Sequence, residues 1–513
     1  MSNFRKKFIE FNKSLWLNVP SNNEIVLVEG RPFVNQMLAS SMAAKAVEEV
    51  FKIPTIVWLS SHQEMDIYLS FSIEKFIKKK KYFLQYFIYI FSNSISTTLK
   101  MLYELGFKRN KIEYFIDFYK LDGIRLGDLI YDTFIRNDLS FLNPNLFSLK
   151  FLKIFIYTMF EFYSIKHFFK KNNVKFAVVS KWQYTNSGAL IARFALYNEI
   201  KVIHATFNQA LLVSNYEHVF HDCFKVFNIE DSRLDENFLD KKIEERFSGE
   251  GHGIDIKSAF SNKIWDEGDL SSFFGSRYDR KKKNVFIMLH AFSDANHLSG
   301  KLIYRDYYKW FSATMEIISK LDNVNWIVKQ HPSRKVYYEE EIVNNFFVNN
   351  DTKNILLLPD NFNTYSVFKL ADSFITARGT IALEASLIGI PSILVGESNF
   401  SNLGFTYDME TVLQYESILS NIENVPSLNE NEILLAKKAF YNYPLTAGSK
   451  LKNIDKSWVF ELFHPSQSII DRRLIEEDYF KRIIHTIGLD FAGKRNPYYK
   501  DILDALKYLK NQN

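Results

Sequence analysis

Apolar runs and amphipathic stretches alternate near the start of the chain. "EIVLVEG" (24–30) is an apolar run ending in an acid and a glycine, which predicts a strand. "PFVNQMLASSMAAKAVEEVF" (32–51) has helical spacing with a proline in its first turn, and "IPTIVWLS" (53–60) predicts a second strand. A strand, a helix and a strand in this order predict a parallel sheet with helices on its faces.

The alternation continues and then restarts in the second half. A strand is predicted at 174–180, a helix at 185–199 and a strand at 201–206. The second half then reads strand, helix, strand, strand and helix, at 284–292, 307–322, 324–333, 354–360 and 363–371. "SFITARGTIALEASLIGIPSILVG", from residue 373, adds a strand, a glycine turn, a helix and a strand. We therefore expect an α/β fold with two open, doubly wound domains, whose ligands bind beyond the carboxyl ends of the strands.

Residues 72–170 interrupt this alternation with mostly helical patterns rich in Phe, Tyr and Lys. "SIEKFIKKKKYFLQYFIYIF" (72–91) places four lysines beside an aromatic run. This pattern is typical of a helix with a solvated basic face and a core face. A second interpretation is a helix that lies on an acidic membrane surface.

The patterns divide the chain into four parts. An N-terminal domain is expected over 1–230, with the helical insertion at about 72–170. A polar linker follows at 231–283, and the C-terminal domain spans 284–460. Residues 461–513 are expected to be helices that cross back to brace the N-terminal domain.

Composition excludes several classes of protein. With 47% hydrophobic and 24% charged residues, the chain has a globular rather than a disordered balance. The net charge of +5 is too mild to indicate a nucleic-acid partner. Cys223 is the only cysteine, which excludes a cysteine-based metal site and favours a reducing, cytoplasmic compartment. The apolar stretches are shorter than the ~20 residues that a spanning helix needs.

The turn "TARGTIALEA" (376–385) is the first candidate for chemistry. Gly379 lets backbone N–H groups approach an anion, and the helix that follows adds about half a positive charge at its N-terminus. Arg378 adds a fixed charge, and Thr380 can cap the helix. Glu384 lies one turn further on the same face, where it can accept both hydroxyls of a ribose. The alternative is an ordinary strand–helix turn with a solvent-facing glutamate.

"KQHPS" supplies a second candidate. Pro332 forces an extended geometry on His331, which then projects from the carboxyl end of a strand. Its imidazole can bind a phosphate or assist the departure of one, and Lys329 lies on the same strand face. The alternative is a histidine that is hydrogen-bonded to its own loop.

In "LHAFSDANH", His290, Asp294 and His297 cluster after the first strand of the second half. Histidine and aspartate are possible metal ligands, but no fourth ligand is evident. These residues are therefore expected to shape the cleft rather than to hold a metal.

The first half offers candidates at the ends of two of its strands. Glu29, in "LVEGRP", can deprotonate an acceptor hydroxyl, and Arg31 can bind an acidic acceptor. Alternatively, Glu29 is simply the acid at a helix N-terminus. The loop after the strand at 174–180 offers Lys181, Tyr184 and Asn186 to an acceptor sugar, or merely starts the next helix.

Taken together, these residues resemble a known group of enzymes. Residues 284–412 look like the donor-binding domain of GT-B glycosyltransferases, and more narrowly like bacterial capsule and surface-polysaccharide proteins that use CMP-activated Kdo or sialic acid. The matching residues are His331 and Pro332 in the His-Pro turn, the glycine-turn–helix–Glu element with "GIPSILVG" after it, and the "HAFSDA" loop. Asp266-Glu267-Gly268 is similar to the acid–acid–glycine base of some sialyltransferases and rivals Glu29 as the base.

The resemblance implies a metal-independent glycosyltransferase with two Rossmann-like domains that face each other across a cleft. It implies a nucleotide-sugar as substrate rather than a cofactor, and a glycan or lipid-linked glycan acceptor of capsule or lipopolysaccharide synthesis. Peripheral contact with the inner membrane is a further expectation. Two alternatives stay open: a sugar-nucleotide epimerase or polyol-phosphate transferase with the same fold, and a non-catalytic component of a membrane polysaccharide assembly.

Overall fold

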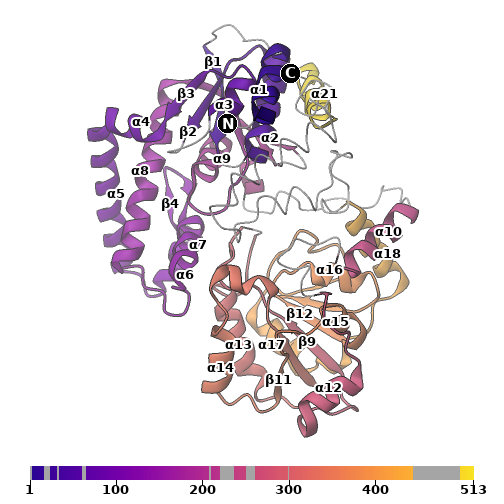
Figure 1. Ribbon diagram of the computed structural model, residues 1–513. Helices are drawn as coiled ribbons and strands as arrows, with labels where there is room; N and C mark the ends of the chain where they lie inside the picture. Colours follow the sequence, from indigo (N-terminus) through magenta and orange to yellow (C-terminus); the bar gives the residue numbers. More distant parts are fainter. Residues whose placement is uncertain are drawn as a thin grey trace. The chain divides into compact units, whose positions relative to one another are not determined.

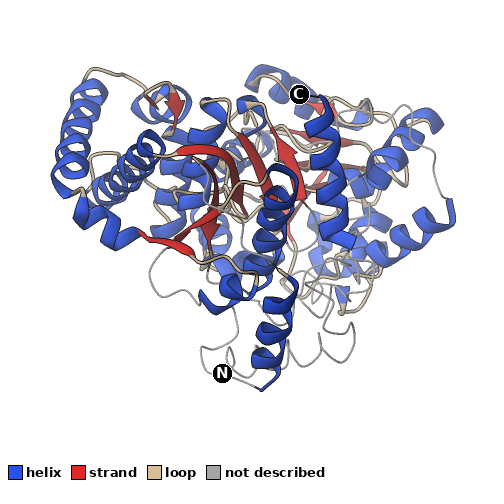
Figure 2. Cartoon of the chain, turned by 90° about the horizontal axis from the view of Figure 1, so that it is seen from above, coloured by secondary structure: helices blue, strands red, loops and turns tan. Residues whose placement is uncertain are grey.

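The computed structural model describes residues 3–16, 23–31, 34–59, 65–206, 210–219, 236–249, 260–298, 300–442 and 497–512. The chain forms two compact units (Figure 1). Unit 1 comprises Met1–Phe134, Asn145–Val219 and Gly448–Asn513, and unit 2 comprises Ile135–Pro144 and Phe220–Ala447. Strands lie inside both units and helices lie around them (Figure 2).

The sheet of unit 1 has the strand order β3-β2-β1-β6-β7-β8. Its strands are β1 (Glu24–Gly30), β2 (Thr55–Leu59), β3 (Lys75–Lys78), β6 (Asn173–Val179), β7 (Lys201–Ala205) and β8 (Ala210–Val213). All pairs are parallel except β7 with β8. This is a doubly wound sheet, and its strand order reverses between β1 and β6, where ligands bind in such folds.

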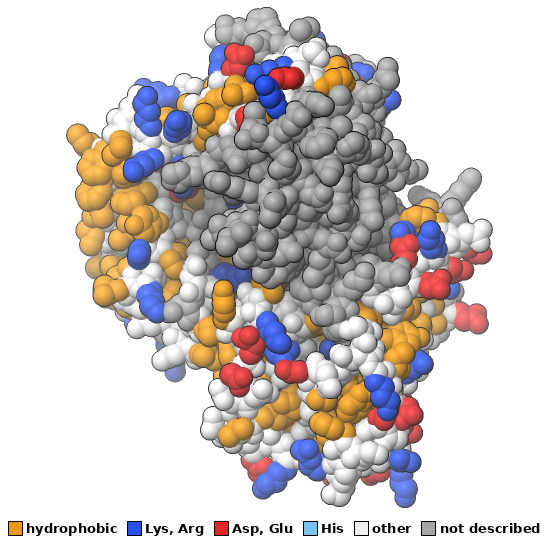
Figure 3. Space-filling model, in the orientation of Figure 1, with side chains coloured by type: hydrophobic (Ala, Val, Ile, Leu, Met, Phe, Trp, Pro, Cys, Tyr) orange, Lys and Arg blue, Asp and Glu red, His pale blue; other side chains and the backbone are white. Residues whose placement is uncertain are grey.

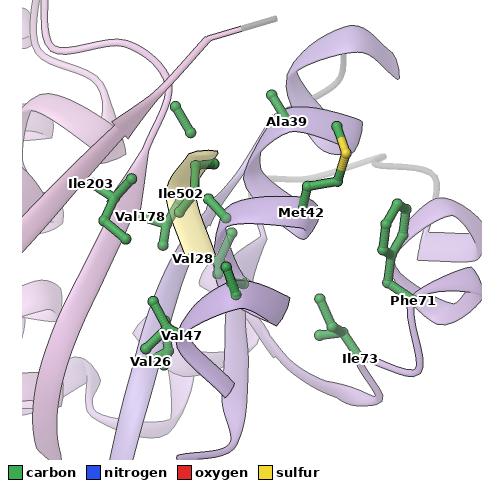
Figure 4. Packing of buried hydrophobic residues seen from close by; sticks show 14 of the residues in the cluster. Val26, Val28, Ala39, Met42, Val47, Phe71, Ile73, Val178, Ile203 and Ile502 are labelled. Carbon is green, nitrogen blue, oxygen red and sulfur yellow. The ribbon is translucent and has the colours of Figure 1, made fainter. Parts of the chain in front are cut away.

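Four helices pack around the sheet of unit 1 and contribute to its core. They are α1 (Asn3–Leu15), α2 (Val34–Phe51), α3 (Met65–Ser70) and α9 (Ser187–Tyr197). The core lies between α2 and the sheet, where Val26, Val28 and Val178 are completely buried (Figure 4).

The C-terminal helix α21 (Pro497–Gln512) packs on α2 and completes this core. Tyr499 donates a hydrogen bond of 2.6 Å to Glu49, and Lys510 donates one of 2.7 Å to the carbonyl oxygen of Val50. Ile502 is buried in the same cluster (Figure 4). The remaining part of the expected C-terminal helices, 461–496, lies outside the described residues.

The region expected to be a helical insertion begins with a strand instead. β3 forms the edge of the sheet, where its lysines face solvent, so the helices start only after it. They are α4 (Lys79–Gln85), α5 (Phe87–Gly106), α6 (Lys111–Phe118), α7 (Gly127–Asp138) and α8 (Leu149–Lys171), with a short hairpin of β4 (Lys120–Leu121) and β5 (Ile124–Arg125).

Unit 2 repeats the architecture with the strand order β11-β10-β9-β12-β13-β14, all parallel. Its strands are β9 (Asn284–Met288), β10 (Asn325–Lys329), β11 (Ile355–Leu357), β12 (Ser373–Thr376), β13 (Ser392–Leu394) and β14 (Tyr407–Asp408). Its helices include α13 (Tyr307–Ile318), α14 (Ile342–Asn349), α15 (Tyr365–Leu370), α16 (Ile381–Ser386), α17 (Val412–Ser420) and α18 (Glu430–Asn442). The strand order reverses between β9 and β12.

Much of the segment expected to be a linker packs into unit 2. It contains α10 (Glu236–Phe247) and α12 (Glu267–Phe274), and Leu239, Leu270 and Phe274 are buried in the core of unit 2. This segment has apolar side chains at helical spacing, but they stand among many charges, and the charges favoured a linker in the sequence analysis. The predicted α/β fold with two doubly wound, Rossmann-like sheets is confirmed. Across the described residues, we find no helix with the length and apolar character to cross a membrane.

Candidate active site

Three side chains converge where the strand order of unit 2 reverses. His290 follows β9, His331 follows β10 and Arg378 follows β12. Because these strands are parallel neighbours, all three residues lie at the edge of the sheet formed by the carboxyl ends of its strands. The rings of His290 and His331 lie 6.3 Å apart and nearly parallel, at 9°. This edge, outside the carboxyl ends of the strands, is where doubly wound folds bind ligands.

His290 is held as a neutral hydrogen-bond acceptor. Its Nε2 accepts from the backbone N–H of Arg378 at 3.2 Å, and its ring stacks on Tyr307 at 4.5 Å. Burial lowers the pKa of His290 well below its ordinary value, and the charges of His331 and Arg378 lower it further. His290 therefore positions the turn through its Nε2.

His331 presents its other ring nitrogen as a donor. Its Nδ1 accepts the backbone N–H of Ser333 at 3.1 Å, so the proton of the neutral ring resides on Nε2. The residue is extended, as Pro332 predicts, and begins a short 3-10 helix, η4 (Pro332–Tyr337). The Nε2–H group can thus donate to a phosphate or a leaving oxygen.

Arg378 carries buried donors that lack partners. Its side chain is 9% exposed, its Nη2 lies 3.4 Å from the carbonyl oxygen of Lys301, and its guanidinium lies over the Tyr307 ring. Nε and Nη1 make no hydrogen bond within the described part of the chain. A Cβ on Gly396 would lie 3.1 Å from Nε, so glycine leaves room for the guanidinium. Two guanidinium nitrogens without an acceptor among the described residues suit an anionic ligand.

The backbone N–H groups of the glycine turn are less available to an anion than expected. The N–H of Arg378 donates to His290, and that of Gly379 lies 3.3 Å from Thr376 Oγ1. The helix that follows, α16, has only six residues, which limits its dipole. The turn therefore offers an anion the side chain of Arg378 rather than backbone N–H groups.

Glu384 and Thr380 both bind Arg246 of α10, which sequence reasoning missed. Arg246 Nε donates to Glu384 Oε1 at 2.7 Å, and its Nη2 donates to Thr380 Oγ1 at 3.2 Å. Thr380 does not cap α16 with its side chain, and Glu384 is 3% exposed rather than solvent-facing. Among the described residues, no hydrogen bond to Glu384 Oε2 is found, so this oxygen remains suited to a hydroxyl.

Lys329 is buried at the end of β10. Burial lowers its pKa to about 8, the charge of Arg334 lowers it further, and Asp360 opposes the shift. Arg334 itself forms an ion pair with Asp360. A bound anion would favour the charged lysine, so Lys329 remains a candidate for the site.

The loop after His290 is built around Glu339, which was not predicted. The Glu339 carboxylate accepts from the backbone N–H groups of Phe292 at 2.7 Å and Ser293 at 2.9 Å, and from Ser293 Oγ. Asp294 is exposed, and His297 Nε2 lies 2.9 Å from the carbonyl oxygen of Arg305. The described residues hold no group of three or more side chains suited to a metal ion.

Glu339 should make the stability of unit 2 depend on pH. Burial raises its pKa from 4.5 to about 7, so the folded protein keeps a proton that the unfolded chain loses. Stability then falls as the pH rises through this window. Relative to Glu339→Gln, the wild type should lose about 1–3 kcal/mol of unfolding free energy between about pH 5 and about pH 8. Urea denaturation at several pH values measures this difference, and a constant difference would contradict the assignment.

Glu29 is buried at the corresponding edge of unit 1. It is 1% exposed and accepts from the backbone N–H groups of Ser180 at 3.1 Å and Gly188 at 3.2 Å. Burial raises its pKa, whereas Arg31, 3.5 Å away, lowers it. A Cβ on Gly188 would lie 2.2 Å from Glu29 Oε2. Glu29 thus holds the loop between β6 and α9, and its role as a catalytic base stays a prediction.

Of the other acceptor-side candidates, Lys181, Tyr184 and Asn186 lie in this loop, and Arg31 lies beside Glu29. Arg31 Nε donates to Gln36 at 3.1 Å, and Lys181 Nζ lies over the ring of Tyr184. Asn186 caps α9 by accepting the N–H of Ala189.

Two further features concern an aromatic pair in unit 1 and the position of the two acids that rival Glu29 as the base. Trp182, which was not predicted, stacks on His204 at 4.6 Å, and both side chains are buried. The rival acids belong to unit 2: Asp266 caps α12, and Glu267 lies 3.4 Å from Tyr278 Oη.

No protein-family model matches the chain, and no curated protein matches it. Among solved structures, it is similar to Thermosulfurimonas dismutans KpsC, beta Kdo 2,4 transferase, at 12% identity over 52% of this chain and 80% of that one, with a TM-score of 0.31. It is similar to the Methanocaldococcus jannaschii UDP-GlcNAc 2-epimerase in complex with UDP-GlcNAc and UDP at 12% identity, over 81% and 97% of the chains, with a TM-score of 0.27. For the S. aureus MnaA–UDP co-structure the identity is 11%, the coverage 91% and 97%, and the TM-score 0.25. Identities and TM-scores this low carry no argument about the reaction. The argument for a reaction therefore rests on the geometry of the site.

Proposed function

We propose that the protein is a glycosyltransferase that binds a nucleotide-sugar in unit 2 and transfers the sugar to a glycan acceptor. The observation that carries the proposal is the buried guanidinium of Arg378, whose Nε and Nη1 lack partners within the described residues. It lies where the strand order reverses, close to two histidines. A phosphate would satisfy these donors.

In the proposed reaction, the acceptor oxygen bonds to the anomeric carbon as the bond from that carbon to the phosphate oxygen breaks. The nucleotide leaves with the electron pair, and the acceptor hydroxyl gives its proton to a carboxylate base, for which Glu29 is the candidate. Arg378 and the Nε2–H group of His331 stabilise the negative charge on the departing phosphate. Glu384 Oε2 accepts a ribose hydroxyl while Arg246 fixes the carboxylate.

Nucleotide binding to the full chain tests the donor site directly. Thermal unfolding against CMP, CDP, UDP, GDP and their sugar forms should show a raised midpoint with one base, because ligand at 100 times its Kd adds about 2.7 kcal/mol of stability. Arg378→Met should abolish this shift. The same variant without ligand should be within about 1 kcal/mol of the wild type or more stable, since the guanidinium is poorly satisfied.

Lys301→Met is the matched control, because Arg378 contacts the backbone carbonyl oxygen of Lys301, which the substitution keeps, so the shift should not change. A shift that persists in Arg378→Met would refute the anion site. No shift with any nucleotide in the wild type would refute the proposed function and favour a non-catalytic assembly protein. Conversion of the donor to its epimer without an acceptor would identify an epimerase instead.

A further inference from the structure

One face of α5 presents apolar side chains to solvent. Ile88, Leu99 and Tyr103 are 83%, 63% and 70% exposed, and Phe91 falls on the same face at helical spacing. Phe107, just after the helix, contacts Tyr103 and is 75% exposed. These five residues are called the α5 stripe.

The opposite face of α5 already has a packing partner. Ile90 and Met101 are buried, and Thr97 forms a hydrogen bond of 2.6 Å with Tyr163 of α8. A surface helix in a globular protein needs one apolar face, whereas α5 has two. The packing of unit 1 therefore does not account for the α5 stripe.

The charge near the stripe is mainly basic, although Lys100 pairs with Glu104 on α5 and Lys79 pairs with Glu161 of α8. Between Glu74 and Glu104 the sequence contains no acid, and its basic residues are Lys75, Lys78, Lys79, Lys80, Lys81 and Lys100. Figure 3 shows hydrophobic side chains gathered along the edge of unit 1 formed by α5, with basic side chains at its borders. An exposed apolar patch with a basic rim indicates an interaction surface.

We propose that the α5 stripe docks on the surface of an anionic lipid bilayer. α5 has 20 residues and so lies about 30 Å along the surface, with its apolar side chains in the boundary between headgroups and acyl chains. The lysines then meet the lipid phosphates. This inference concerns unit 1 alone and does not depend on the donor site.

The charges favour lipid over a second copy of the chain. In a twofold interface the same patch meets itself, which would bring two sets of lysines together. The one carboxylate of α5, that of Glu104, already pairs with Lys100 of the same helix. A bilayer with anionic lipids supplies the opposite charge to the lysines.

Vesicle co-sedimentation of the full chain tests the proposal. The protein should bind vesicles of phosphatidylcholine with phosphatidylglycerol about tenfold more strongly than vesicles of phosphatidylcholine alone, and less strongly at high salt. Ile88→Glu/Leu99→Glu should lower binding to the anionic vesicles about tenfold or more, because two carboxylates would enter the apolar boundary. Lys80→Gln/Lys81→Gln should weaken binding and reduce its dependence on salt.

Val348→Glu is the matched control, since Val348 is 83% exposed on α14 of unit 2. It should leave vesicle binding unchanged. The substituted side chains are exposed, so circular dichroism should show intact folds for all variants. Equal binding by the wild type and Ile88→Glu/Leu99→Glu would overturn the proposal. So would a wild-type dimer that binds no vesicles and that Ile88→Glu/Leu99→Glu converts to a monomer.

Discussion

Arg246→Met is expected to destabilise unit 2 by about 3–5 kcal/mol, because it leaves the buried carboxylate of Glu384 without its partner. The two side chains are 8% and 3% exposed, and Arg246 Nε and Nη2 both lie 2.7 Å from Glu384 Oε1. Urea denaturation of the wild type and the variant measures the loss.

Lys242 provides the control on the same helix. Its ion pair with Glu245 is partly exposed, so Lys242→Met should cost less than about 1 kcal/mol. Adding Glu384→Gln to Arg246→Met should recover part of the stability, since no charge is then left unpaired. If Arg246→Met costs no more than Lys242→Met, the buried pair does not stabilise the protein.

The second large effect is expected on the reaction. His331→Asn should lower kcat/KM about 10²–10³-fold, because an asparagine oxygen can replace Nδ1 as the acceptor of the Ser333 N–H while the Nε2–H donor is lost. Steady-state transfer with the nucleotide-sugar identified in the binding panel measures this loss. The midpoint of thermal unfolding without ligand should change little, since the bond to the Ser333 N–H is kept.

His331→Gln is the matched variant, because the amide nitrogen of glutamine can occupy the place of Nε2. It should retain more activity than His331→Asn and should be less stable, since its side chain does not replace Nδ1. Equal activity in both variants, close to that of the wild type, would exclude His331 from the reaction.

Local patterns predicted the strands that carry the candidate site. The apolar run before His290 forms β9, and Pro332 gives His331 its extended backbone. In both cases the determining residues lie next to one another in the chain. The same reasoning located Arg378 and Gly379 after β12.

Partners distant in the sequence could not be predicted in this way. Arg246 lies 138 residues from Glu384, and Ser180 lies 151 residues from Glu29. The sequence shows an acid at the end of a strand, but not the donors that tertiary folding brings to it. For this reason the sequence could suggest Glu29 as a base but could not show that its carboxylate also holds a loop.

Charged residues also concealed two elements. α10 lies in a segment whose many charges favoured a linker, although Leu239 and Phe247 pack into unit 2. β3 combines two lysines with two apolar residues, which a helix would accommodate equally well. Only its pairing with β2 makes it a strand.

The docking of α21 on α2 has a consequence for the order in which the protein folds during synthesis. Most of unit 1 precedes unit 2 in the chain, yet Tyr499, Ile502 and Leu506, which follow unit 2, belong to its core. The apolar surface of α2 that they cover therefore stays uncovered until all of unit 2 has been translated. During that interval it is exposed to chaperones and to other nascent chains.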